Sequence, residues 1–322
     1  MGWWLVGADT LARSRFVVSP LAETVARLMD LEAGTAAYPG ERLWHDTHLR
    51  AYRARLAADP VAAAVVRAGF GAHWTADFLT PAPAGETPLL EEELARLRAT
   101  PAETAHADLA VSLGGPLPAG LRRADVVERA AGLLEWVWAE AVRPYWPRWR
   151  RIVEADVVAR TERLSRGGWA AVLEGMGPGT RWLGEGRLRI NSRPYAPREL
   201  HGADLLLVPV TPRRGWVTWD EPHRYAVVYP CDGVLAGTEP RPAPGPLGAL
   251  LGAARAEVLL LLGSPRSTTH LVALTGQGLG SVGRHLKVLH EAGLIRRRRA
   301  GRSVLYRRTE AGESLVRAGG GT

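Results

Sequence analysis

The alternation of hydrophobic and polar positions is clearest near the end of the chain, in residues 271–308. Gly293 predicts the end of a helix there, because glycine adopts the left-handed conformation after a helix without steric cost. Residues 295–299 and 303–307 then alternate like strands around a tight turn at 300–302. The pattern predicts helix, turn, helix and a basic β-hairpin. The apolar positions of the second helix recur at helical spacing: Val282, Leu286 and Leu289, followed by Leu294.

The polar side of this second helix carries side chains that can donate hydrogen bonds to phosphates or base edges of DNA. With the basic hairpin as a wing, the segment predicts a DNA-reading module. The helix residues expected to contact the major groove or flanking phosphates are Ser281, Arg284, His285 and Lys287. The wing residues expected on phosphates or in the minor groove are Arg298, Arg299 and Arg302.

An alternative for the same segment is a dinucleotide-binding loop, because Gly278, Gly280 and Gly283 match the pattern G-x-G-x-x-G. Such a site needs a strand before the glycines, further strand–helix units after them and an acidic residue for the ribose. Only about forty residues follow Gly283, and arginines 296–299 stand where the acidic residue belongs. The preceding residues 267–269, Ser-Thr-Thr, are typical of a helix cap. We therefore favour the DNA-reading module.

Residues from about 247 to 315 resemble the winged helix-turn-helix of the ArsR family of repressors. The resemblance rests on residues 281–312, SVGRHLKVLHEAGLIRRRRAGRSVLYRRTEAG, which are similar to that family's recognition helix, wing and final helix. It implies a homodimer that binds a palindromic operator in double-stranded DNA and is modulated by an effector. The N-terminal part also resembles an uncharacterised domain of some actinobacterial ArsR-type regulators, through residues 16–28, 77–85 and 91–101. That second resemblance implies no known chemistry.

The segment departs from the family at the start of the recognition helix. Gln277, Gly278 and Leu279 stand where members usually have Leu, Ser and Pro, so the usual N-cap serine and first-turn proline are missing. Gly280 and Gly283 lie inside the helix, where each costs about 0.5–1 kcal/mol relative to alanine. We therefore expect the first turn of this helix to be soft.

The rest of the chain predicts helices followed by short strands. Ser19 and Pro20 are typical of an N-cap and a first helical residue. Helical patterns recur in six segments: 21–31, 43–57, 60–69, 88–99, 125–142 and 147–164. Short β-like runs occur in four segments: 10–18, 187–191, 204–210 and 225–229. We expect an α+β fold, in which a mostly helical N-terminal domain with a small antiparallel sheet precedes a C-terminal winged helix-turn-helix.

Length, composition and charge divide the chain at the same place. At 322 residues the chain is long enough for two or three domains. A proline-rich linker at 241–246 is expected between an N-terminal sensor or interaction domain, 1–240, and the DNA-binding domain, 247–318. From Leu247 onward the chain has 12 Arg and Lys against 4 Glu, a net charge of +8 that equals the charge of the whole chain. A neutral body with a basic terminal module indicates one polyanion-binding surface.

Candidate chemistry outside this module is sparse. Cys231 is the single cysteine, which excludes an intramolecular disulfide and a thiolate cluster, so the cysteine site of metal-sensing family members has no counterpart. His45 and His48 beside Asp46 have a spacing that could hold a metal on a helix, but two histidines without a third ligand are more often surface or packing residues. No metalloprotease, hydrolase or P-loop motif occurs. We expect no cofactor, no metal and no enzymatic activity.

The sequence also bears on the location of the protein. No apolar run reaches the roughly 18 residues that a membrane span needs. The first residues lack the charged n-region of a secretory leader. We therefore expect a cytoplasmic protein without a membrane partner.

All 12 tryptophans precede the predicted linker. Indole rings build ordinary cores, and they also line pockets for flat or cationic ligands. Both interpretations stay open for each ring. As a site for a small-molecule effector, the sequence favours the surroundings of Pro144, flanked by Trp136, Trp146 and Trp149.

Together these features predict a DNA-binding transcriptional regulator, with repression as the expected mode. Two alternatives from other classes stay open. In the first, the N-terminal domain is an enzyme that acts on a small molecule. In the second, the protein is an adaptor whose winged helix has lost DNA binding. Binding of the purified protein to its own promoter fragment, and release by a metabolite, would distinguish them.

Overall fold

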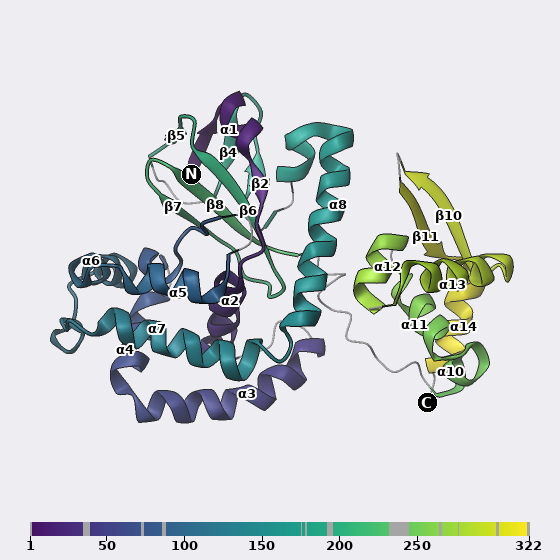
Figure 1. Cartoon of the computed structure of the whole chain (residues 1–322), viewed down its shortest axis with the longest axis horizontal. Coiled ribbons are helices and arrows are strands. Elements are labelled where there is room, and N and C mark those ends of the chain that lie inside the picture. The colour runs from purple at the N-terminus through teal and green to yellow at the C-terminus, as the bar shows by residue number, and fades with distance from the viewer. Residues whose placement is uncertain are drawn as a thin grey trace. The chain divides into compact units, whose positions relative to one another are not determined.

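A computed structural model describes most of the chain (Figure 1). The described residues are 2–34, 39–71, 74–85, 88–174, 176–177, 179–191, 196–231, 245–263, 266–275, 277–300 and 303–320. The chain divides into two compact units: residues 1–153 with 169–231, called the body below, and residues 154–168 with 232–322, called the C-terminal unit. Both helices and strands are abundant, which confirms the predicted α+β class.

The helices of the body agree closely with the apolar periodicity of the sequence. They are α1 (Ala8–Arg13), α2 (Pro20–Ala33), α3 (Pro39–Ala58), α4 (Pro60–Gly69), α5 (Leu90–Arg98), α6 (Ala102–Leu113) and α7 (Val126–Val137), and α8 (Trp146–Leu173) belongs in part to each unit. Of these, α4 has the predicted bounds and α6 was not predicted. The chain continues from α7 into a π-helical turn at Trp138–Val142. Among the described residues, no helix has the length and apolar character needed to cross a bilayer.

Helix α2 is the central helix of the body and packs against α3, α5, α7 and strand β6 (Asp204–Val210) (Figure 1). The predicted start is confirmed: the Oγ of Ser19 accepts a hydrogen bond from the Ala22 amide at 2.9 Å, and Pro20 is the first helical residue. The helix ends at Gly34, whose φ of 66° lies in the left-handed region that favours glycine. Eleven of its 14 residues are buried, so its polar side chains need partners inside the protein.

Two four-stranded sheets complete the body. The first has the order β3-β4-β1-β5 and consists of β1 (Trp3–Val6), β3 (Arg181–Trp182), β4 (Arg187–Arg189) and β5 (Arg198–Leu200). The second has the order β2-β6-β8-β7 and consists of β2 (Arg15–Phe16), β6, β7 (Trp216–Asp220) and β8 (Arg224–Pro230). One face of the second sheet packs on α2 in a core cluster with the members Val17, Ala22, Ala26, Ala82, Leu206, Val208, Val210, Ala226 and Val228.

The predicted small antiparallel sheet is corrected, because both sheets are mixed. Strand β6 pairs in parallel with β8 and with β2, and only the β7–β8 pair of that sheet is antiparallel. Strand β7, which was not predicted, reverses the chain between β6 and β8, so β8 returns in the direction of β6. The predicted strand at 10–18 is also wrong over most of its length. Its first four residues, 10–13, belong to α1, where Leu and Ala favour a helix, and only Arg15 and Phe16 form a strand, β2.

The C-terminal unit combines short helices with a three-stranded antiparallel sheet of order β10-β11-β9. Its elements are α10 (Gly245–Leu251), α11 (Ala253–Leu261), β9 (Arg266–Ser267), α12 (Thr268–Thr275), α13 (Leu279–Glu291), β10 (Ile295–Ala300), β11 (Ser303–Arg308) and α14 (Glu310–Gly320). The predicted helix and hairpin are confirmed as local structure. Most of the predicted linker 241–246 lies outside the described residues, and its last two residues begin α10.

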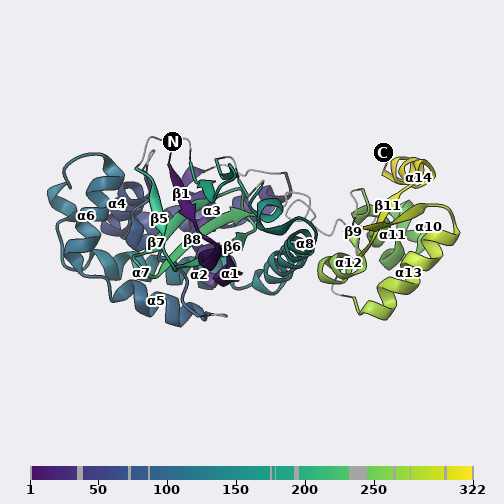
Figure 2. The same cartoon turned by 90° about the horizontal axis from the view of Figure 1, so that it is seen from above.

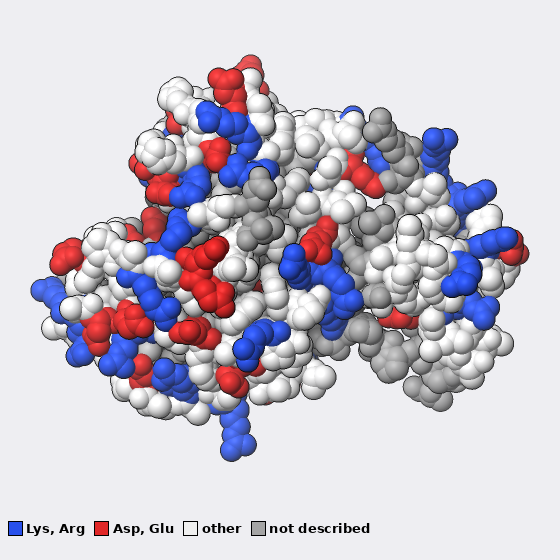
Figure 3. Space-filling view, viewed as in Figure 1, with Lys and Arg blue, Asp and Glu red and all other residues white. Residues whose placement is uncertain are grey.

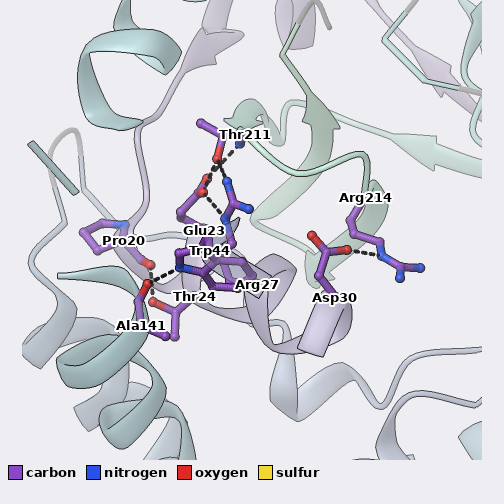
Figure 4. Close-up of polar contacts among 9 residues, drawn as sticks. All are labelled: Pro20, Glu23, Thr24, Arg27, Asp30, Trp44, Ala141, Thr211 and Arg214. Atoms are coloured by element: carbon purple, nitrogen blue, oxygen red, sulfur yellow. Dashed lines mark hydrogen bonds and ion pairs between the residues drawn. The ribbon is translucent and has the colours of Figure 1, made fainter. Parts of the chain in front are cut away.

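The buried charges of α2 form a network with the loop after β6 (Figure 4). The carboxylate of Glu23 accepts hydrogen bonds from the backbone amide of Thr211 at 2.8 Å and from its hydroxyl. Arg27 lies 3.2 Å from the same carboxylate and donates to the Thr211 hydroxyl at 2.6 Å. One turn later, Asp30 accepts a hydrogen bond from Arg214 at 2.9 Å. These contacts join α2 to the second sheet through buried polar groups, of which only Arg214 is partly exposed.

Two indole rings complete the surroundings of Arg27. Its guanidinium lies 3.9 Å from the ring centre of Trp149 and 4.7 Å from that of Trp44. Trp44 in turn donates from Nε1 to the Ala141 carbonyl of the π-helical turn at 2.8 Å (Figure 4). Cation–π contacts in a desolvated site are worth about 2 kcal/mol. The network therefore ties α2, α3, α8 and the π-helical turn together.

We predict that Arg27→Met lowers the free energy of unfolding by about 3–5 kcal/mol, because Glu23 is left as a buried charge without its cation. The double variant Glu23→Gln, Arg27→Met should recover part of that loss. Urea unfolding followed by tryptophan fluorescence measures both changes. A double variant that is less stable than the single one would contradict this account of the pair.

A second buried carboxyl connects α2 with α5. Glu93 accepts hydrogen bonds from the Ser19 hydroxyl at 2.6 Å and from the Leu21 amide at 2.9 Å. Burial raises the pKa of Glu93 from its ordinary value to about 7, although these two hydrogen bonds favour the carboxylate. The protonated carboxyl is therefore the stable form in the folded protein at mildly acid pH.

We predict that this carboxyl makes stability fall as the pH rises. The folded-state pKa lies above the unfolded one, so the contribution of Glu93 is complete below about pH 4.5 and is lost as the pH passes 7. The difference in unfolding free energy between Glu93→Gln and the wild type should change by on the order of 3 kcal/mol over this range, in favour of the variant. The exposed neighbour Glu91→Gln is the matched control in urea unfolding. Parallel pH profiles of Glu93→Gln and wild type would refute the assignment.

Candidate nucleic-acid interface

Helix α13 is held in the C-terminal unit by its apolar side. Val282, Leu286 and Leu289 are buried in one core cluster with Ile295 of β10 and with residues of α11 and α12. Figure 2 shows α13 beside the strands of the hairpin. The helix begins after Gly278, which has extended backbone angles and no side chain to cap the first amides. The predicted lack of an N-cap side chain is therefore confirmed, and only backbone bonds from Ser281 and Val282 to the Gly278 carbonyl close the first turn.

The other side of α13 faces away from this core. Arg284, Lys287 and His290 are exposed there. Arg284 forms no ion pair with any described residue, and Lys287 reaches Glu291 only at 3.9 Å. Gly280 and Gly283 lie on the exposed part of the same helix, with open space around both positions. Arg284, with no ion pair among the described residues, and Lys287, with one long ion pair, are available to an external anion.

Ser281 and His285, the other two helix residues predicted to contact DNA, contact each other. The hydroxyl of Ser281 lies 3.3 Å from Nε2 of His285 and donates to Oε1 of Gln277 at 3.2 Å. Burial lowers the pKa of His285, and the cations Arg255 and Arg284 lower it further. His285 is therefore neutral near pH 7. The hydrogen bonds of Ser281 and His285 therefore stabilise the first turns of α13, and neither side chain adds charge to the surface of the helix near pH 7.

The hairpin distributes its arginines over two faces, because successive side chains of a strand point to opposite sides. The strand register places Ile295, Arg297 and Arg299 on one face, opposite Arg308, Tyr306 and Val304. The other face carries Arg296 and Arg298, opposite Arg307 and Leu305. Arg298 and Arg299, which were predicted together, therefore lie on different faces. Arg302 lies outside the described residues.

Sequence reasoning missed part of this basic surface. Arg296, Arg297 and Arg307 join Arg298 and Leu305 around a hollow of about 510 Å³. The alternation of side chains along a strand places Arg296, Arg298 and Arg307 on one face only when the pairing register is known. The register is a property of the folded hairpin. In the space-filling view, the visible face of the C-terminal unit shows more basic than acidic side chains (Figure 3).

The predicted ligand-binding tryptophans occupy different surroundings. Trp149 is buried under Arg27, stacks on Tyr145 with ring centres 5.2 Å apart, and meets Trp44 edge to face at 5.9 Å. The ring centres of Trp146 and Trp138 are 5.6 Å apart, although Trp138 precedes the break at Pro144 and Trp146 follows it. Trp146 and Trp136 are both half-buried. The aromatic face of Trp149 is thus covered by a cation of the protein itself.

The histidines considered for a metal contribute to packing. His45 is buried, with Nδ1 at 3.4 Å from Asp46, and His48 lies 3.2 Å from the Tyr145 hydroxyl. Burial lowers the pKa of His48, which favours its neutral form. Within the described ranges, no three His, Cys, Asp or Glu side chains converge on a point that could hold a metal ion. Cys231 is a buried free thiol.

We predict that Gly283→Ala stabilises α13. The helix loses a residue with high backbone entropy, and the added methyl group meets no atom within 4 Å. The gain should be about 0.5–1 kcal/mol. Amide hydrogen exchange of the full chain would show slower exchange in α13, with Gly312→Ala as a contrasting variant because its methyl group would collide with the Leu294 carbonyl. Unchanged or faster exchange in α13 of Gly283→Ala would contradict the soft-helix interpretation.

Comparisons with protein-family models, with curated proteins and with solved structures find no match for this chain. The feature of the C-terminal unit that bears most on its function is the set of exposed cations on α13 and on the hairpin.

Proposed function

We propose that the C-terminal unit is a winged helix-turn-helix that binds double-stranded DNA, and that the protein is a transcriptional regulator. In this proposal α12 and α13 are the two helices of the motif, α13 enters the major groove, and the β10–β11 hairpin is the wing. The observation that carries the proposal is the exposed side of α13. Arg284 stands there without an ion pair among the described residues, and Lys287 reaches only Glu291, at 3.9 Å, in the same unit as the arginine-rich hairpin.

The charge distribution supports a polyanion as the partner. Residues from Leu247 onward have a net charge of +8, whereas the rest of the chain has equal numbers of basic and acidic side chains. A basic surface confined to one module is the electrostatic signature of nucleic-acid binding, because each neutralised phosphate releases counterions. The alternative dinucleotide site needs a strand at residues 270–274, and these residues belong to helix α12.

The proposed contacts differ in kind. Arg284 and Lys287 would reach base edges or phosphates directly from the exposed side of α13. Ser281 and His285 would act near the start of the helix, where their mutual hydrogen bond can be exchanged for one to a phosphate. Arg298, Arg299 and Arg302 of the wing would contact phosphates or the minor groove. Because Arg298 and Arg299 lie on opposite faces, only one of them can serve a given segment of backbone.

The finer features of the proposal come from the family resemblance and the composition of the body. We propose a cytoplasmic homodimer that represses transcription at a palindromic operator and is not an enzyme. An effector would bind in the body, near Trp136, Trp146 and Trp149, because the neutral body holds every tryptophan of the chain. The π-helical turn at Trp138–Val142 lies at the same place, and such turns are frequent at functional sites.

We predict that the full chain binds its own promoter fragment with an affinity that falls linearly on a log–log plot against salt. Arg284→Ala should weaken operator binding by about 1–3 kcal/mol and relax the preference at one base position. Arg299→Ala should weaken all duplexes alike. Arg317→Ala removes the same charge from an exposed position of α14, which is part of neither α13 nor the hairpin, and is the matched control. Fluorescence anisotropy with labelled duplexes measures all four proteins.

Three results would count against the proposal. Binding that does not change with salt would exclude a phosphate-dominated interface. Equal losses in Arg284→Ala and Arg317→Ala would show that only the total charge matters. A protein that binds no duplex at all would favour the adaptor or the enzyme.

A further inference from the structure

The three-stranded sheet of the C-terminal unit has one face that the helices do not cover. Ile295 and Tyr306 lie on the covered face and pack with Leu286 and Leu289 of α13. By the register of the hairpin, the opposite face carries Arg296, Arg298, Leu305 and Arg307, and these four residues are called the outer face below. All three arginines are exposed and Leu305 is half-buried.

The outer face brings like charges together. Arg296 and Arg307 are directly opposite each other in the antiparallel pair, and Arg298 is opposite Leu305. Like charges in directly opposed positions destabilise a sheet. None of the three arginines forms an ion pair with a carboxylate of the described residues. The hairpin thus maintains a repulsive cation pair, which a bound anion would turn into an attractive site.

The shape of the outer face is concave. The outer-face residues line a hollow of about 510 Å³ together with Arg297, which the register places on the covered face, and this volume is within the range of small-molecule sites. Its lining is mostly apolar, from Leu305 and the side-chain carbons of the arginines, and the arginines add positive charge. Guanidinium groups bind phosphate oxygens in bidentate fashion and stack on flat rings. The lining therefore suits a molecule that has both phosphate groups and an apolar flat part.

We propose that the hollow of the outer face binds a phosphorylated organic anion with a flat ring, the chemistry of a nucleoside diphosphate. Arg296 and Arg307 hold the phosphates between them, Arg298 contacts the ring or a further oxygen, and Leu305 forms the apolar floor. The site shares Arg298 with the wing contacts proposed above, but it is separate from the DNA contacts proposed for α13, because α13 packs on the other face of the sheet. The inference goes beyond the proposed function and stands on the geometry of the hairpin.

The test uses the full chain, without DNA, in isothermal titration calorimetry. ADP should bind with one site per chain, inorganic pyrophosphate should bind more weakly, and adenosine should not bind, because the phosphates supply most of the attraction and the ring adds to it. Arg307→Ala and Arg296→Ala should each weaken ADP binding by roughly tenfold or more, since each removes hydrogen bonds to a charged group. Arg317→Ala, on α14, should leave the affinity within about twofold of the wild type.

Two further measurements distinguish the loss of ligand contacts from the loss of the fold. The unliganded Arg296→Ala and Arg307→Ala variants should melt at or above the temperature of the wild type, because each removes the repulsion between the opposed cations. Arg307→Lys keeps the charge but lacks the planar fork, so it should bind ADP with an affinity between those of the wild type and Arg307→Ala.

Several outcomes would overturn the proposal. ADP that fails to bind the wild type, or that binds the three alanine variants equally, would rule out the hollow as the site. If ADP fails to bind while Arg296→Ala and Arg307→Ala lose affinity for a duplex, the outer face is a DNA surface. That result would leave the proposed DNA-binding function intact. Conversely, a chain that binds ADP through Arg307 but binds no duplex would refute the proposed function alone.

Discussion

The body depends on one buried interaction, the carboxylate of Glu23 with Arg27 and Thr211. Because α2 is almost wholly buried, its charged side chains cannot be solvated and must be paired in place. Pairing Glu23 with the loop after β6 fixes the distance between the central helix and the second sheet. Trp44 and Trp149 then pack on the guanidinium of Arg27 and bring in α3, α8 and the π-helical turn.

This arrangement bears on how a ligand could act on the body. Trp149 is covered on one face by Arg27, whereas Trp146 contacts Trp138, which lies before the break at Pro144. A flat or cationic effector near this break would compete with contacts that already hold α2 in position. An effector of this kind would therefore change the packing of α8, which belongs in part to each unit.

The exposed basic surface of the C-terminal unit follows a different principle, although Arg308 of the same unit pairs with Glu313 at 3.2 Å. The body pairs its buried carboxylates and guanidinium groups, whereas Arg284 and the outer-face arginines form no ion pair with any described residue, and Lys287 reaches Glu291 only at 3.9 Å. Such a surface is stable only because water and salt solvate it, and it gains free energy when an anion replaces them. The opposed pair of Arg296 and Arg307 is the clearest instance, because the sheet places two like charges side by side.

The local elements could be predicted from the sequence by itself. The bounds of α4, the Ser19–Pro20 start of α2, the apolar side of α13 and the uncapped Gly278 all follow from periodicity and capping, which involve neighbours in the chain. Only the tertiary structure decided the parallel pairing of β6 with β8, the contact of Glu23 with a residue 188 positions away, and the outer face of the hairpin. These features depend on strand register and long-range packing, and no local pattern of hydrophobic and polar residues specifies which distant segments meet.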